Sequence, residues 1–395
     1  NTGLHAAGDG PGIELDAALA GGVLLLTQGQ LSLSADMSIA ADLTIDAQGA
    51  SRVMRITDGH AALSGLSLIN GAVTGKGGGL ELQSGGSAAL TGVTVGDNMA
   101  TGGAGGVHVA LGATLTARDT AVIDNATGLY GGGLIVNGDA TFLNSEIGGN
   151  SAGKWGGGVD LDGGGALSLV NVTVHGNSAV NGGAGVDAWN GALSVVSSTF
   201  TGNTAGGRGG AIYMSSASDH QSSVANSIFA GNAAASVITG HDMFLAGQDL
   251  DFAGGVILGT QARTASGAFA APADKVTVLD DEGLTLADLF AEIDAVTGGG
   301  RVEDNGGPVR SAALALRVDN PALGGADGSV GRDAQDLDGD GTTDETMPVD
   351  ARMVERGAIF DIGAHEATSD PASAMVNTLL DVVDADDGLL SLREA

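Results

Sequence analysis

An acidic run near the C-terminal end of the chain has the spacing of a calcium-binding loop. Aspartates stand at positions 1, 3, 5 and 9 of this run, with glycine at position 6 and threonine at position 7. Such a run can fold carboxylate and carbonyl oxygens around one ion. Position 12 is Met347 rather than glutamate, so a helix-flanked EF-hand is not expected, and Glu345 or Asp350 would complete the shell. The predicted calcium ligands are Asp336, Asp338, Asp340, Thr342 and Asp344; a solvated acidic turn is the alternative.

A second acidic group follows close to the end of the sequence. Its spacing is not diagnostic of a metal site, so it is the weaker of the two candidates. Calcium bound there would stiffen a junction between neighbouring copies of the chain. The residues of this possible second cluster are Asp381, Asp384, Asp386 and Asp387.

A third group combines aromatic rings with carboxylates in the middle of the chain. Rings beside carboxylates suit the binding of a sugar or a cation, and paired carboxylates also occur in glycoside hydrolases. Tyr130 and Trp155 precede equivalent glycine phrases, so we expect their rings to stack on adjacent coils of a repeat. The predicted ligand-binding face consists of Tyr130, Trp155, Asp160, Asp162, Asp187, Trp189 and Tyr213. Ordinary surface residues are the alternative, and catalysis is the least favoured interpretation, because Arg208 is the only nearby basic candidate.

Repeated phrases must position all of these residues. A glycine-rich phrase closes on an apolar residue at intervals of 25 to 27 residues, at Leu80, Val107, Leu134, Val159, Val186 and Ile212. A second phrase ends in asparagine at similar intervals, at Asn98, Asn125, Asn150, Asn177, Asn203 and Asn232. A fixed period in this range is typical of a repeat architecture whose units stack on one another.

The repeat predicts an all-β fold. Apolar residues two apart form columns across the repeats, and residues two apart on a strand share one face. The glycine and Gly-Asn phrases between them are turn signals. We therefore expect a right-handed parallel β-helix with three strands and about 26 residues per coil. The asparagine column is expected to be structural, with amides stacked in a ladder.

Four segments follow from this pattern. Residues 1–22 would form an N-terminal cap, residues 23–259 the β-helix, and residues 260–370 an irregular C-terminal cap with the calcium loop. Residues 371–395 would pair with the next module or subunit. One short helix is expected within residues 285–294, with Thr285 as its cap. His108 and His175 occupy positions held by other residue types in other coils, so we expect them to be surface variation.

Composition excludes several classes of protein. The chain has 395 residues, 47 of them acidic and 15 basic, for a net charge of −32. Such a surface repels nucleic acid and anionic membranes, and favours divalent cations. No stretch approaches the ~20 apolar residues of a membrane span, so membrane insertion is not expected. There is no cysteine, which excludes disulfides and thiolate sites.

Several segments resemble a known family. Residues 43–49 and 66–71, together with the glycine and Gly-Asn phrases, resemble bacterial surface proteins with right-handed parallel β-helix repeats. Residues 304–308, 320–325 and 361–366 look like the terminal part of those modules, often called choice-of-anchor domains. The end of the chain resembles the CSLREA motif, with Leu390 in place of its cysteine. The resemblance implies export to the bacterial surface, and the family has no common catalytic residues to carry over.

The order of these segments differs from that of the family. There the CSLREA-like segment precedes the β-helix, whereas here it comes last. We therefore expect one period of a tandem or polymeric array, in which residues 375–395 cap the first coil of the next copy. A head-to-tail contact that does not close into a ring makes a filament. The predicted junction residues are Leu379, Leu392, Arg393 and Glu394. An arbitrary boundary within a giant repeat protein is the alternative.

The sequence thus predicts a non-catalytic, secreted or surface-exposed structural or adhesive module. It would be stabilised by calcium and joined head-to-tail with copies of itself into a fibre or adhesin stalk. The alternative is a glycan-binding or glycan-cleaving β-helix protein that uses the face between Trp155 and Tyr213, with an extracellular glycan as partner.

Overall fold

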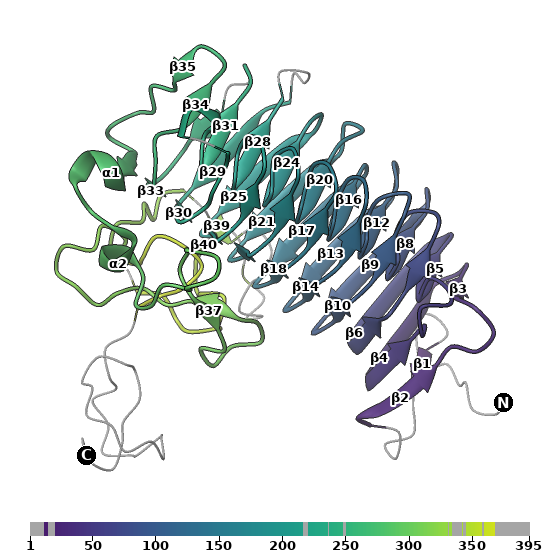
Figure 1. Cartoon of the computed structure of the whole chain (residues 1–395). Helices are drawn as coiled ribbons and strands as arrows, with labels where there is room; N and C mark the ends of the chain where they lie inside the picture. Colours follow the sequence, from purple (N-terminus) through teal and green to yellow (C-terminus); the bar gives the residue numbers. More distant parts are fainter. Residues whose placement is uncertain are drawn as a thin grey trace, which may run out of the picture.

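The chain folds into a rod of stacked coils with its C-terminal region folded against one end (Figure 1). The computed structural model describes residues 12–14, 20–215, 220–235, 237–247, 250–330, 332–333, 342, 345–357 and 359–367. Three sheets run along the rod, and their strands pair in parallel from coil to coil. This is the right-handed parallel β-helix that the sequence predicts.

Sheet A contains two strand segments from most coils. The first segments are β1 (Gly12–Glu14), β4 (Met37–Asp46), β6 (Gly59–Ile69), β9 (Gly86–Thr91), β13 (Thr114–Arg118), β17 (Asp139–Leu143), β21 (Ala166–Val170), β25 (Ala192–Val196), β29 (Ser222–Ala225) and β32 (Leu250–Phe252). The second segments are β2 (Gly22–Leu25), β10 (Thr94–Gly96), β14 (Ala121–Ile123), β18 (Glu146–Gly148), β22 (Thr173–His175), β26 (Thr199–Thr201), β30 (Ser227–Phe229), β33 (Val256–Leu258) and β36 (Val276–Val278). In β4 and β6 the two halves are continuous.

Sheets B and C complete each coil. Sheet B contains β3 (Leu31–Leu33), β5 (Met54–Ile56), β8 (Leu80–Leu82), β12 (Val107–Val109), β16 (Leu134–Val136), β20 (Val159–Leu161), β24 (Val186–Ala188), β28 (Ile212–Met214), β31 (Met243–Leu245), β34 (Arg263–Thr264) and β35 (Gly267–Ala268). Sheet C contains β7 (Ala72–Val73), β11 (Met99–Ala100), β15 (Ala126–Thr127), β19 (Ser151–Ala152), β23 (Ser178–Ala179) and β27 (Thr204–Ala205).

A sharp bend separates the two segments of sheet A in each regular coil. The residue at the bend has a left-handed backbone, as in Asp119 (φ 52°), Asn144 (φ 46°) and Asn171 (φ 53°). Asparagine and aspartate tolerate this conformation better than other non-glycine residues. One side of the coil is therefore bent, and the apolar alternation continues on both sides of the bend.

The core is one continuous column of apolar side chains. Successive strands place like residues over one another, as when Leu134 pairs with Val159 and Val159 with Val186. These side chains are fully buried and belong to a single cluster that extends from Leu26 to Val276. Burial of apolar surface, at about 25 cal/mol per Å², is the main stabilising term for such a column.

The asparagine column is the predicted ladder. The Nδ2 of Asn150 donates to Oδ1 of Asn177 at 3.0 Å, and Nδ2 of Asn177 donates to Oδ1 of Asn203 at 2.9 Å. Each Oδ1 also accepts from the backbone N–H of the preceding asparagine, and each Nδ2 also donates to a backbone carbonyl. All six side chains are buried. Each of these side-chain amides therefore forms hydrogen bonds to two neighbouring coils.

The last asparagine donates to a carboxylate. Nδ2 of Asn232 donates to Oδ1 of Asp242 at 2.9 Å. Oδ2 of Asp242 accepts from the backbone N–H and the hydroxyl of Thr260, at 2.8 and 3.0 Å. A carboxylate accepts without needing to donate, so it can end a row of amides that all donate in one direction.

The C-terminal region is irregular and covers more than the end of the rod. It contains α1 (Leu279–Glu282), α2 (Leu286–Leu289), and the two-residue strands β37 (Val302–Glu303), β38 (Ser311–Ala312), β39 (Arg332–Asp333) and β40 (Glu345–Thr346); a 3-10 turn, η2 (Val237–Thr239), precedes it within the rod. The expected helix is α2, where Thr285 and Asp288 form a capping box. The helix α1 was not expected from the sequence.

This region lies along the flank of the rod as well as at its end (Figure 1). Its hydrogen bonds reach Asn144, Asn171, Thr199 and Asn226, one in each of four consecutive coils. Met347, Val349 and Phe360 pack on Leu143 of β17. We expected a cap on the last coils; the region is also a side covering, because outward-facing apolar residues of sheet A need burial.

A buried charge network fixes this covering in place. Arg356 is fully buried and donates to Glu366 Oε2 at 2.9 Å and to the carbonyl oxygens of Asp361 and Gly363. The neighbouring His365 is buried beside Arg352 and Arg356, and burial lowers its pKa to about 3. Asp361, Gly363, His365 and Glu366 belong to the segment 361–366 that resembles the terminal part of surface β-helix modules. Its polar groups are internal hydrogen-bonding groups of the cap.

We expect Asn177→Ala to lower the free energy of unfolding by about 2–4 kcal/mol, because the change leaves buried donors of Asn150 without an acceptor. Denaturant unfolding followed by circular dichroism measures this change. Asn190→Ala, in a partly exposed turn, is the matched control and should alter stability by less than about 0.5 kcal/mol. Equal changes in the free energy of unfolding for the two variants would show that the ladder adds no stability beyond that of backbone pairing.

Candidate functional site

Most of the predicted calcium ligands lie outside the described residues. Of the first group only Thr342 is described, and it is exposed. The second cluster at residues 381–387 and the predicted junction residues Leu379, Leu392, Arg393 and Glu394 also lie outside the described residues. Within the described part of the chain, no three or more His, Asp or Glu side chains are arranged to hold a metal ion. The calcium site stays a prediction.

The predicted ligand-binding face is fully described. Its central residues form one row across sheet B, in which Asp160 of β20 pairs in register with Asp187 of β24, and Asp187 pairs with Tyr213 of β28. Tyr213 pairs in turn with Phe244 of β31. The flanking residues on each strand point into the core, so these four side chains are on the outward side of the rod. The sequence predicted this placement.

This outward row is nevertheless buried. Asp160 is 8% exposed, Asp187 2% and Tyr213 7%. The glycine phrase before each strand folds back over it: a Cβ on Gly156 would lie 2.9 Å from Cα of Asp160, and one on Gly183 would lie 2.7 Å from Cα of Asp187. Only glycine allows so close an approach. The glycine loops therefore cover this row of side chains and exclude it from solvent; we call this covering the roof.

Trp155 extends this roof across two coils. Its indole ring lies against Tyr213, with ring centroids 4.8 Å apart and planes tilted by 49°. A Cβ on Gly182 would lie 2.6 Å from Cζ3 of the indole, so the ring also lies on the coil that carries Asp187. We expected Trp155 to stack with Tyr130; that expectation is wrong. Tyr130 instead faces the Nζ of Lys154, 5.2 Å from its ring centroid.

The aromatic series continues beyond Trp155. Tyr213 stacks on Phe244 with centroids 5.8 Å apart, and the guanidinium of Arg208 lies 4.8 Å from the Phe244 ring centroid. Arg208 also bonds to the Tyr213 side chain. These rings contact one another and a protein cation, so they form an internal cluster rather than a free platform for a ligand.

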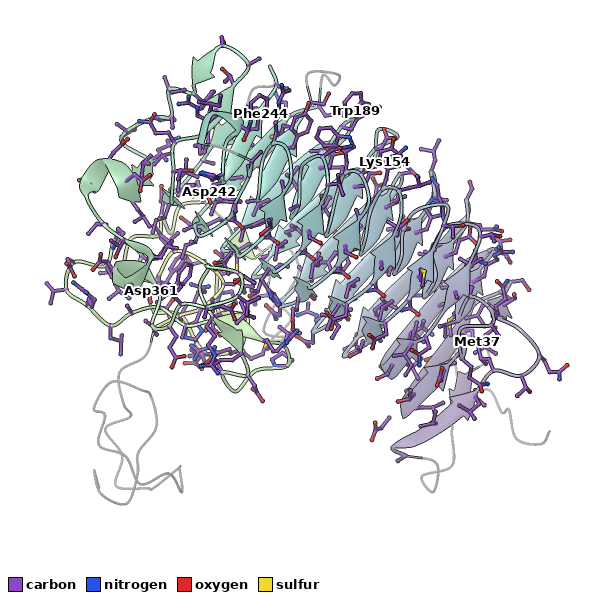
Figure 2. The ribbon with its side chains drawn as sticks, in the orientation of Figure 1. Met37, Lys154, Trp189, Asp242, Phe244 and Asp361 are labelled. Atoms are coloured by element: carbon purple, nitrogen blue, oxygen red, sulfur yellow. The ribbon has the colours of Figure 1, made fainter. Side chains whose placement is uncertain are left out.

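The remaining members of the face lie at its edge. Asp162 and Trp189 come two residues after Asp160 and Asp187 on successive strands, and Trp189 is 48% exposed. Figure 2 shows Trp189, Lys154 and Phe244 along the same edge of the rod. Tyr130 is 39% exposed in an earlier coil. The face therefore has a buried centre and scattered exposed rings.

The two central carboxylates perturb each other. Burial, together with the nearby charge of Asp162, raises the pKa of Asp160 to about 7. Burial also raises the pKa of Asp187 well above its usual value, and the charge of Asp160 adds to this effect. Two carboxylates in hydrogen-bonding contact cannot both ionise without large repulsion.

This geometry does not suit glycoside hydrolysis. The paired carboxyl groups of such enzymes are at least about 5 Å apart and flank an accessible substrate. Here the two side chains bond to each other beneath the glycine loops. Of this face, a glycan could contact Trp189, Tyr130 and Asp162. Asp160 and Asp187 are too buried to contribute to such binding.

We expect Gly182→Ala to destabilise the protein by about 1–3 kcal/mol, because the new methyl group would collide with the Trp155 ring and the Arg208 carbonyl oxygen. Thermal unfolding measures the change, and tryptophan emission reports whether Trp155 is displaced. Gly128→Ala, where no atom lies within 4 Å of the new methyl group, is the control and should be close to neutral. Similar destabilisation by both substitutions would contradict the close packing of Trp155 against the coil that carries Asp187.

A second polar site was missed from the sequence. His175 of β22 bonds to Oε1 of Glu146 on β18 at 2.8 Å, and Arg310 of the C-terminal region donates to the same carboxylate, from Nε at 2.9 Å. Burial alone would raise the pKa of Glu146, and these two partners outweigh it and lower the pKa. Gly148 leaves the space that the imidazole fills.

Glu146 is therefore an anchor for the C-terminal region. His175 is its hydrogen-bonded partner within the rod, so the interpretation of His175 as surface variation was wrong. His108 is also buried, 3.7 Å from Oε1 of Glu81. Neither contact could be read from the sequence, because the partners are a full coil or more away.

A groove of about 330 Å³ lies between the last coils and the first helices of the C-terminal region. Asn232, Asp242, Thr260, Leu279 and Leu286 line it. Burial raises the pKa of Asp242 to about 6, against hydrogen bonds from Asn232 and Thr260 that favour the carboxylate. The oxygens of Asp242 already accept four hydrogen bonds. We therefore assign this residue to the end of the asparagine ladder rather than to ligand binding.

Asp242 should make stability depend on pH. The pKa of Asp242 is higher in the folded chain than in the unfolded chain. Its contribution to the free energy of unfolding is therefore fully present below about pH 4 and is lost as pH rises through about 6. The loss is at most about 1.4 kcal/mol per pH unit. We expect Asp242→Asn to remove this part of the slope, measured as unfolding free energy from about pH 4 to 7. Asp251→Asn, at an exposed position of β32, should keep it. An unchanged slope in Asp242→Asn would contradict this assignment.

Comparison with known proteins gave no match: no protein-family model, no curated protein and no solved structure is similar to this chain. The parallel β-helix that the resemblance implies is present in the structure, whereas its choice-of-anchor and CSLREA parts have no support beyond the segments that carry them. None of the helices in the described part of the chain is long and apolar enough to cross a membrane.

Proposed function

We propose that this chain is a non-catalytic structural module that joins head-to-tail with copies of itself into an extracellular fibre or adhesin stalk. The observation that carries the proposal is the open first coil at the N-terminal end of the rod. The strand β2 pairs with β4 on one side and has no second partner among the described residues. An unpaired strand edge is a template for another strand.

The first coil also leaves apolar side chains in water. Leu24 continues the inward column of Ile45 and Leu68, yet it is 43% exposed, since no strand among the described residues pairs with β2 on its other side. Val23 and Leu25 on either side are 60% and 50% exposed. Three consecutive exposed apolar residues on an edge strand are unusual in a monomer and favour an interaction site.

The opposite end of the core is closed. The hairpin of β34 and β35 ends sheet B, and Phe269 turns over the core with its ring centroid 5.9 Å from that of Phe252. The two ends of the rod are therefore different surfaces. A contact between unlike ends is heterologous and repeats without limit when it does not close into a ring.

Residues 371–395 of a second copy are the occupant that we propose for the open coil. They contain the segment 376–383, in which five of eight residues are apolar, and the residues Leu379, Leu392, Arg393 and Glu394 that we assign to the junction. Strand addition would provide main-chain hydrogen bonds and cover Leu24. The likeness of this segment to the CSLREA motif, and secretion to a bacterial surface, belong to the same proposal.

Calcium is proposed as a stabiliser of this assembly. The proposal rests on the spacing of the aspartates at 336–344 and on the acidic surface, whose repulsion between copies a divalent cation would reduce. Chelation should then weaken the assembly.

The glycan alternative has less support. Its central carboxylates are buried beneath the Trp155 roof, and its exposed rings, Trp189 and Tyr130, are not in contact with each other. No observation favours it over the structural role.

We expect the intact chain with calcium to form filaments in negative-stain electron microscopy and to sediment as large species. Removal of residues 371–395, or Val23→Asp, should leave single rods. The matched control is Val180→Asp, because Val180 is equally exposed (62%) but lies on the side of the rod. Single rods of the intact chain at all calcium and protein concentrations would contradict self-assembly and leave a covalent tandem array as the remaining form of this role.

A further inference from the structure

The strongest unused feature of the molecule is the buried acid pair, Asp160 and Asp187. The two residues pair directly across β20 and β24, and they are 8% and 2% exposed. Oδ1 of Asp187 has no hydrogen-bond donor among the described residues. Neither carboxylate has an ion pair with lysine or arginine in that part of the chain. A buried oxygen without a donor is costly unless something else neutralises it.

The surroundings do not supply the missing charge. Asp162, just after β20, adds a further negative charge, and on the neighbouring β16 the facing residue is the apolar Ile135. On β28 the facing group is Tyr213, whose phenol is bonded by Arg208. Lys76 acts on Asp160 only through a weak, distant attraction.

One proton shared between the carboxyl groups resolves both problems. It removes one of the two like charges, and it makes an O–H···O bond that satisfies the unpaired oxygen of Asp187. Burial and the nearby charge of Asp162 raise both pKa values, and the charge of Asp160 further raises that of Asp187, which favours the singly protonated pair near neutral pH.

The roof above the pair depends on this neutralisation. The Trp155 loop, residues 153–156, lies across the coil of Asp187 and ends in the contact between the indole and Tyr213. Two ionised carboxylates beneath it would need water, and water can enter only if the roof lifts.

We propose that Asp160 and Asp187 form a proton-operated latch that holds the Trp155 loop closed over sheet B and releases it when the shared proton is lost. The closed state is therefore favoured at low pH and weakens as pH rises through neutrality. The released state exposes Asp160, Asp187 and the Tyr213 ring to solvent. This device is independent of the proposed assembly, because it lies on the side of the rod.

The chain offers a clean reporter of the latch. It has two tryptophans, so Trp189→Phe leaves Trp155 as the single tryptophan. In this variant we expect the emission of Trp155 to shift to the red and its quenching by acrylamide to rise between about pH 6 and 9. Circular dichroism over the same range should keep its β-sheet signal.

Two further variants decide the cause. Asp187→Asn in the Trp189→Phe background replaces the shared proton with a permanent amide donor, so the pH transition should disappear and Trp155 should stay protected. Asp162→Asn removes a nearby acid outside the pair, and the transition should remain, displaced to lower pH.

Three results would overturn the proposal. The first is a Trp155 signal that does not change with pH in the Trp189→Phe variant. The second is the same transition in the Asp187→Asn variant. The third is a transition that coincides with loss of the β-sheet signal, because that would be unfolding of the coils rather than opening of the loop.

Discussion

Hydrogen bonding between successive coils is the constraint on which the rest of the structure depends. The hydrogen-bonding groups of each coil find their partners in the neighbouring coils, through backbone pairing and through the buried asparagine ladder. An amide can occupy every interior position of such a ladder because it both donates and accepts. The last position differs, since it must accept only, and Asp242 meets this need. The ladder therefore ends at Asp242, although strands of sheets A and B continue beyond it.

Glycine loops impose the second constraint. They fold back onto sheet B and turn outward positions into buried ones, so a charge placed there must find a partner within the neighbouring coils. Glu81 lies beside His108, Arg52 and Arg55, and these partners outweigh burial and lower its pKa to about 2. The acid pair of Asp160 and Asp187 has no such cation and depends on a proton instead. Both outcomes come from the same one-dimensional stacking, in which a side chain meets only the coils beside it.

The two ends and two flanks of the rod are unequal. One end leaves Leu24 exposed, whereas Phe269 closes the other. One flank carries the C-terminal region, which is held by the buried Arg356 network and by Arg310 on Glu146. The asymmetry of the ends gives a direction to any assembly of copies.

The sequence by itself determined the coil. The period, the apolar columns, the turn glycines and the asparagines of the ladder are all local patterns that one alignment of the repeats reveals, and Thr285 marked its helix for the same reason. Contacts between coils or between distant segments were decided only by the tertiary structure. Examples are Trp155 on Tyr213, His175 on Glu146, and the burial of Asp160 and Asp187. Sequence gives the direction in which a side chain points, whereas burial depends on what folds back over it, and the roofing loops and the C-terminal covering are set by three-dimensional packing.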